Sequence, residues 1–152
     1  EVYNGLQTFH GPSDFILSGN VDDVWHNSQG ELIVVEYKTI TKEDHISSSE
    51  EIEPEHKQQL EMYQWLLRQK GHQVNNTGYF VFCVGRTDKK AFDAKLEFEV
   101  ELLPYEGKDD WIEETLIQAQ QTLKAKHPPK TDKYNPIFTY CMAVSEAQKN
   151  LD

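Results

Sequence analysis

The sequence predicts an α/β fold in which a mixed β-sheet is flanked by helices. Apolar runs of strand length alternate with two stretches of helical periodicity along the 152 residues. A chain of this length can bury one continuous core, and neither a repeat nor a linker divides it, so residues 1–152 are predicted to form a single domain. Seven tyrosines, seven phenylalanines and three tryptophans separate it from disordered chains, although 27% of its residues are charged.

The first half of the chain predicts a β-hairpin. A strand over residues 15–25 is followed by a turn at 27–30 and by a second strand over 31–40. The second strand contains the continuous apolar run 32–35, so we expect it in the middle of the sheet. Residues 41–54 are polar and acidic without periodicity, which is typical of a loop.

The second half predicts a helix, two strands and another helix. Leu60, Tyr63 and Leu67 recur on one face of a helix over 54–70, which Pro54 begins and Gly71 ends. A strand over 77–84 is apolar on both faces and should be buried. In a strand over 95–103 the apolar side chains point one way and three glutamates the other, which favours a half-exposed strand toward a sheet edge (Leu96, Phe98, Val100 and Leu102; Glu97, Glu99 and Glu101). An amphipathic helix over 109–126 precedes a proline-containing tail.

Composition limits the classes of partner. A net charge of -11 opposes general attraction to nucleic acid, yet basic side chains gather in two stretches that could give a locally positive surface (Arg86, Lys89, Lys90 and Lys95; Lys124, Lys126, Lys130 and Lys133). No apolar run is long enough to span a bilayer, so we expect no membrane partner. With two cysteines far apart in the sequence, the cytoplasm is the expected compartment. Cys83 reads as a buried small hydrophobe, and it has no CxxC partner.

The residues best suited to chemistry lie on the hairpin. Glu36 and Lys38 are two residues apart on a strand, so both side chains leave the same face. Asp22 can lie near Glu36 across the short turn, and two carboxylates with the Tyr37 carbonyl form an oxygen-rich site suited to Mg²⁺ or Mn²⁺. The triplet alone favours a surface Glu–Lys pair on an ordinary strand, because short acid–x–Lys matches occur in most proteins, and only its surroundings favour a metal site.

Those surroundings form an ordered set. Gly19-Asn20-Val21-Asp22, a turn, an apolar run, Glu36-Tyr37-Lys38-Thr39 and a helix with Gln59 and Tyr63 follow one another. The set resembles the PD-(D/E)xK nuclease superfamily over residues 15–84, specifically its RecB-like branch, which includes helicase-linked exonucleases and CRISPR-adaptation nucleases. The resemblance implies a restriction-endonuclease-like fold and Mg²⁺- or Mn²⁺-dependent hydrolysis of DNA, with an exonuclease-type role in DNA repair, recombination or defence. A helicase or another protein partner is also implied, whereas oligomeric state is not.

The resemblance also assigns roles to single residues. It makes Asp22 and Glu36 metal ligands and Lys38 the catalytic lysine, with Gln59 and Tyr63 as supports from the helix. The helical spacing equally fits a stripe in which Tyr63 belongs to the core. Relatives add a histidine or glutamate from an upstream helix, and His10 is the upstream candidate here; the alternatives are that this helix precedes residue 1 or that the site lacks this ligand. Cys141 alone cannot hold the iron–sulfur cluster found in many relatives, so none is expected.

Two other interpretations remain open at this stage. One is a nuclease-like domain that binds nucleic acid or a protein partner without cutting, which the negative charge favours. The other is an acidic protein-interaction domain unrelated to nucleases, which would make the whole ordered set a coincidence.

Overall fold

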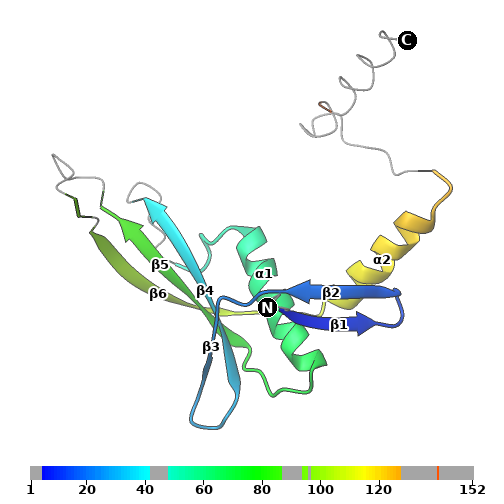
Figure 1. Ribbon diagram of the computed structural model, residues 1–152, viewed down its shortest axis with the longest axis horizontal. Helices are drawn as coiled ribbons and strands as arrows, with labels where there is room; N and C mark the ends of the chain where they lie inside the picture. Colours follow the sequence, from blue (N-terminus) through cyan, green and yellow to red (C-terminus); the bar gives the residue numbers. More distant parts are fainter. Residues whose placement is uncertain (1–4, 42–47, 87–93, 96, 128–139, 141–152) are drawn as a thin grey trace.

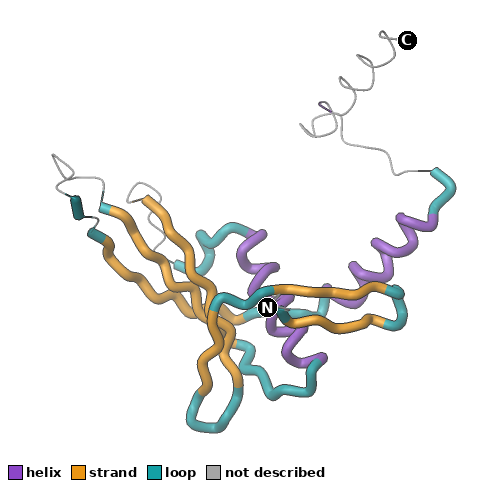
Figure 2. The backbone as a smooth tube through the Cα atoms, in the orientation of Figure 1, coloured by secondary structure: helices purple, strands orange, loops and turns teal. Residues whose placement is uncertain are grey.

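The computed structural model describes residues 5–41, 48–86, 94–95, 97–127 and 140 of the chain (Figure 1). Its elements follow one another in the order β1 (Leu6–His10), β2 (Phe15–Gly19), β3 (Asp23–His26), β4 (Leu32–Thr41), α1 (Pro54–Gln69), β5 (Thr77–Gly85), β6 (Phe98–Glu106) and α2 (Ile112–Lys124). Strands β3 to β6 form one sheet, and β1 with β2 forms a separate antiparallel hairpin (Figure 2). The predicted α/β fold with a mixed sheet and flanking helices is confirmed.

The four-stranded sheet has the order β3-β4-β5-β6. β4 pairs antiparallel with β3 and parallel with β5, while β5 pairs antiparallel with β6. Parallel neighbours need a long connection, and α1 lies in the connection between β4 and β5. The prediction that the 31–40 strand is central is confirmed, because β4 has a partner on each side.

Helix α1 begins and ends as its sequence predicts. Pro54 stands in the first turn, where its missing N–H costs nothing. After Gln69 the chain leaves the helix through Lys70, and Gly71 has φ 85°, a left-handed conformation that glycine adopts without strain.

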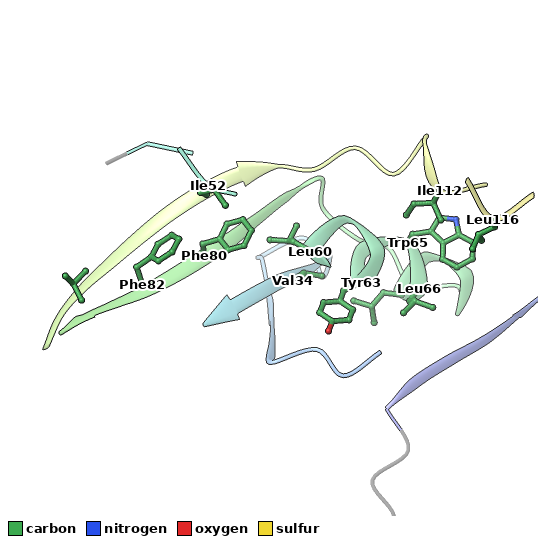
Figure 3. Packing of buried hydrophobic residues seen from close by; sticks show 12 residues of the cluster. Val34, Ile52, Leu60, Tyr63, Trp65, Leu66, Phe80, Phe82, Ile112 and Leu116 are labelled. Carbon is green, nitrogen blue, oxygen red and sulfur yellow. The ribbon is translucent and has the colours of Figure 1, made fainter. Parts of the chain in front are cut away.

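The core lies between α1, one face of the sheet and α2. Leu60 and Leu66 of α1 are buried with Phe80 and Phe82 of β5, and Ile112 joins them from α2 (Figure 3). Alternation along β4 therefore turns Val34, Glu36 and Lys38 toward the helix side, since Glu36 lies beside Phe80 and Lys38 beside Phe82 in the sheet.

The predicted single strand over 15–25 is wrong. The chain forms β2 up to Gly19, leaves regular structure at Asn20–Asp22, and enters β3 at Asp23 in a different sheet. Gly19 passes so close to α1 that a Cβ there would lie 2.5 Å from Cε1 of Tyr63. Glycine and asparagine interrupt strands, and here they mark the point where the chain turns from α1 toward the sheet.

The structure also departs from expectation at three smaller points. No element was predicted for residues 6–10, which form strand β1. β6 is an edge strand as predicted, but three of its apolar side chains lie on the sheet face opposite α1, with Phe98, Val100 and Leu102 exposed by 47%, 67% and 50%. Cys83, expected to be buried, is only partly so, because it lies on that same face beside Val100.

Some predictions fall outside the described residues, including those for Leu96, Cys141, the proline-containing tail and the basic residues Lys89, Lys90, Lys130 and Lys133. Within the described part of the chain, neither helix is long and apolar enough to cross a membrane.

Candidate functional site

A continuous chain of hydrogen bonds joins four of the predicted site residues. Lys38 Nζ donates to Glu36 Oε2 at 3.1 Å and to Gln59 Oε1 at 2.9 Å. Gln59 Nε2 in turn donates to the Tyr63 hydroxyl at 3.1 Å. The helix spacing of four residues puts Gln59 and Tyr63 on one face of α1, and the strand spacing of two does the same for Glu36 and Lys38. The structure thus brings the strand pair and the helix pair together.

Asp22 joins this group through the backbone of β4. Its Oδ2 accepts a hydrogen bond of 3.0 Å from the Tyr37 amide. In a strand the N–H and C=O of one residue point to the same side, so the Tyr37 carbonyl also lies toward Asp22 rather than toward β5. The Asp22 carboxylate, the Glu36 carboxylate and the Tyr37 carbonyl therefore converge at the edge of β4 where its pairing with β3 has ended.

Glu36 is fully buried, and its two oxygens have different surroundings. Oε2 accepts from Lys38, whereas Oε1 has no hydrogen-bond partner. Burial raises the pKa of Glu36 to about 7, the Lys38 hydrogen bond opposes this shift, and the nearby negative charge of Asp22 adds to it. A buried oxygen without a partner beside a second carboxylate is an expensive arrangement for a carboxylate on its own.

A divalent cation fits this arrangement. It would provide the missing partner of Glu36 Oε1 and would offset the repulsion between Asp22 and Glu36. Asp22 is exposed, and a hollow of about 480 Å³ opens beside it between Leu6 and Leu67, so solvent and ligands can reach this carboxylate. Among the described residues, no group of three or more His, Cys, Asp or Glu is placed to hold a metal. The candidate site therefore depends on two carboxylates and a backbone carbonyl.

His10 is held elsewhere in the structure. Its Nδ1 lies 2.7 Å from Ser13 Oγ, its Nε2 lies 2.6 Å from Glu113 Oε2, and its ring meets the edge of Trp65. It stands at the end of the β1–β2 hairpin opposite to the end where Leu6 pairs with Gly19. Although predicted as a metal ligand, His10 is buried in a contact between this hairpin and α2.

Asp23 and the side chain of Tyr37 extend the site in a way that the sequence analysis missed. The Tyr37 hydroxyl donates to Asp23 Oδ2 at 3.0 Å, and Trp25 Nε1 donates to the same oxygen at 3.0 Å. These hydrogen bonds, with one from the Val24 amide, lower the pKa of Asp23. Alternation along the strands signals that Tyr37 faces away from Glu36, but its pairing with Asp23 depends on the register between β3 and β4.

The fold and the site together define an α/β protein with a mixed sheet whose central strand β4 carries a glutamate and a lysine, with a second carboxylate beside them just before β3. A family model described as the PD-(D/E)XK nuclease superfamily matches residues 2–143, and the chain belongs to this superfamily. The four-stranded mixed sheet with its helices is consistent with the restriction-endonuclease-like fold of that family. Comparisons with curated proteins and with solved structures found no match.

Membership of this superfamily indicates which activity the site residues could serve. The superfamily is one of nucleases that generally use divalent metals, which suggests nuclease activity and nucleic-acid binding for this chain. It also argues against an acidic interaction domain unrelated to nucleases.

Proposed function

We propose that the chain is a divalent-metal-dependent nuclease that hydrolyses phosphodiester bonds of DNA. The observation that carries the proposal is Glu36, a buried carboxylate with one oxygen bound to Lys38 and the other without a partner beside Asp22. We further propose the RecB-like branch, because Gln59 and Tyr63 of α1 connect to Lys38 by hydrogen bonds. An exonuclease-type role in DNA repair, recombination or defence follows from that branch.

The metal would be Mg²⁺ or Mn²⁺, held by Asp22, Glu36 and the Tyr37 carbonyl. When bound it would supply positive charge for the phosphate oxygens and lower the pKa of a water molecule. His10, the fourth predicted ligand, would have to leave Ser13 and Glu113 to take part.

Lys38 has the position and charge of the catalytic lysine. Glu36 and Gln59 fix its ammonium group from two sides, and its side chain is 17% exposed, so part of it remains open to a substrate. There it can orient the attacking water or stabilise charge that develops on the phosphate as the P–O ester bond breaks. Gln59, itself held by Tyr63, keeps the ammonium group in place.

Cleavage of labelled DNA with Mg²⁺ or Mn²⁺, and with EDTA, tests the proposal. We expect metal-dependent cleavage that Glu36→Gln and Lys38→Met each lower by about 100-fold or more, since each removes a charge from the site. Cleavage that survives both substitutions would contradict the assignment.

Glu61→Gln is the matched control. Glu61 is also a buried glutamate, but its carboxylate accepts hydrogen bonds from Tyr105, Trp111 and the Lys108 amide on the other side of α1. Loss of the Glu61 carboxylate should lower the free energy of unfolding and leave the rate of DNA cleavage per folded molecule unchanged. The comparison separates loss of a buried carboxylate from loss of the site.

The second candidate function is a nuclease-like domain that binds nucleic acid or a protein partner without cutting. Two observations favour it: the net charge of -11, and the absence of a third acidic or histidine ligand among the described residues near Asp22 and Glu36. Under this alternative the wild-type chain would bind its partner and leave DNA intact with either metal.

A further inference from the structure

Asp22 stands where the regular structure of β3 has not yet begun. The pairing of β3 with β4 starts at Asp23, which lies opposite Val35, so sheet hydrogen bonds do not hold Asp22 itself. Asp22 is also exposed, and the Tyr37 amide is the backbone group of β4 that donates a hydrogen bond to it. Something other than the sheet must keep this carboxylate beside Glu36.

Asp23 provides that connection from the other face of the sheet. Its Oδ2 accepts from the Tyr37 hydroxyl and from Trp25 Nε1, and its Oδ1 accepts from the Val24 amide at 2.7 Å. The Trp25 indole packs against the ring of Tyr79 on β5, with ring centroids 5.8 Å apart. The Asp23 side chain is thus tied to β3, β4 and, through Trp25, to β5.

Tyr37 is consequently held at two points by two adjacent aspartates. Asp22 accepts from its backbone amide and Asp23 accepts from its hydroxyl. One contact is made at the β4 backbone and the other at the tip of the Tyr37 side chain, so together they fix both the segment that carries Asp22 and the peptide that carries the Tyr37 carbonyl. A hydrogen bond from a residue that does not itself bind the metal typically orients the groups that do.

We propose that Asp23 and the Tyr37 hydroxyl are positioning residues that set the geometry between Asp22 and the Tyr37 carbonyl. The inference rests on the proposed function, because those two groups are proposed metal ligands. Neither Asp23 nor the hydroxyl touches the metal or the DNA; both act through Asp22 and the β4 backbone.

The test uses Tyr37→Phe, which removes only the hydroxyl, and Asp23→Asn, which keeps the shape of the side chain. Binding of Mn²⁺ alone is measured from the loss of the free Mn²⁺ signal in electron paramagnetic resonance, and DNA cleavage is measured in parallel. Each substitution should weaken Mn²⁺ binding by about 10-fold, which is the low end of the affinity loss when a residue that supports a metal ligand is changed. In cleavage at saturating Mn²⁺, kcat should fall while KM for DNA stays within twofold.

The matched control is Tyr79→Phe. It removes a hydroxyl from a partly buried tyrosine on the same sheet face and keeps the ring that packs on Trp25. Mn²⁺ affinity should stay at the wild-type value. Tyr37→Phe removes the hydrogen bond that Asp23→Asn weakens, so the two effects should not add. The double variant should bind Mn²⁺ at most about twofold more weakly than the single variant of lower affinity.

The outcomes separate the two proposals. If the wild-type chain binds Mn²⁺ and the two single variants bind it equally well, the positioning role is overturned and the nuclease assignment stands. The same holds if the variants only lose thermal stability, since that marks a purely structural contact. If the wild-type chain does not bind Mn²⁺, the proposed function fails and this inference fails with it.

Discussion

At the scale of single residues, the site is organised around the unequal environment of one carboxylate. Glu36 lies in the core beside Phe80, a position that normally takes an apolar side chain, and a single lysine contact satisfies one of its oxygens. Asp22 adds a second negative charge from outside the sheet. Such an arrangement is costly without a cation, and this cost links stability, pH and metal binding.

The metal-free chain should lose stability as pH rises from about 5 to about 8. The folded state holds the Glu36 proton up to a pKa of about 7, whereas the unfolded state loses it near 4.5. Between these values the folded state binds more protons, so the free energy of unfolding falls with rising pH, by on the order of 2 kcal/mol. Urea unfolding in EDTA at several pH values measures this fall.

Glu36→Gln provides the reference for that experiment. The amide does not titrate, so the difference in unfolding free energy between wild type and variant isolates Glu36 from every other group. A wild-type curve parallel to the variant curve would contradict the assigned protonation. Saturating Mn²⁺ should remove the difference in slope, because metal binding requires the ionised carboxylate.

At the scale of elements, the close approach of Gly19 to α1 decides how the chain passes from β2 to β3. A side chain at this position would collide with the Tyr63 ring, which is 9% exposed and hydrogen-bonded to Gln59. Gly19→Ala should therefore lower the free energy of unfolding by about 1–3 kcal/mol and should also slow DNA cleavage, since Tyr63 is displaced. Denaturant unfolding and single-turnover cleavage measure the two effects.

Gly11→Ala is the control for that substitution. Gly11 lies in the turn between β1 and β2, and the nearest atom to an added Cβ is Cε1 of Phe9 at 4.0 Å. Its stability should change by less than about 0.5 kcal/mol. Equal losses at both positions would show that the contact with Tyr63 is not responsible.

The β1–β2 hairpin meets α2 through His10, Ser13 and Glu113. His10→Ala would leave Ser13 Oγ, which is fully buried, with only the His10 carbonyl 3.5 Å away. We expect a loss of about 1–3 kcal/mol in unfolding free energy, the cost of a buried polar group without a good partner. Mn²⁺ affinity, measured by calorimetry on the same variant, should not change.

His26→Ala gives the comparison. His26 is exposed, so this substitution should change the free energy of unfolding by less than about 0.5 kcal/mol. A tenfold loss of Mn²⁺ affinity in His10→Ala would instead restore His10 as a ligand. It would mean that the hairpin moves when metal binds.

At the scale of the whole molecule, a charge of -11 sets how the chain can meet DNA. Repulsion should keep affinity low in EDTA, and a divalent cation between the carboxylates and a phosphate should raise it by at least about 10-fold. Fluorescence anisotropy with the Lys38→Met variant measures this binding without cleavage. Because few phosphates are contacted, DNA affinity should depend only weakly on salt. The slope of log affinity against log salt concentration should be below about 3 in magnitude.

Tight binding in EDTA with a steep salt dependence would contradict this picture. It would point to a basic surface that operates without metal, as in the alternative of a non-cleaving domain.

Much of the fold could be predicted because its signals are local. The apolar run in β4, the helical stripe of α1 and the turn before Glu31 each depend on neighbouring residues, and all three elements were placed to within a residue or two. The break after Gly19 could not be predicted, because it reflects the approach of Tyr63, which is 44 positions further along the chain. The exposed apolar face of β6 was also missed, since alternation shows two faces without telling which one α1 covers.

The candidate site likewise has a part that local sequence patterns predict and a part that depends on distant residues. Strand and helix spacing placed Glu36 with Lys38 and Gln59 with Tyr63, and the structure joins the two pairs. The register between β3 and β4 decides that Asp23 meets the Tyr37 hydroxyl, and no local pattern encodes a register. The contacts of His10 depend on Glu113, more than 100 residues away.

The most direct test of the central claim is a crystal structure of the chain with Mn²⁺, located by its anomalous scattering. We predict one Mn²⁺ bound by Asp22, by Glu36 through the oxygen that now lacks a partner, and by the Tyr37 carbonyl, with water completing the shell. Ordered Mn²⁺ at His10 and Glu113 alone, or none near Glu36 at millimolar concentration, would contradict it.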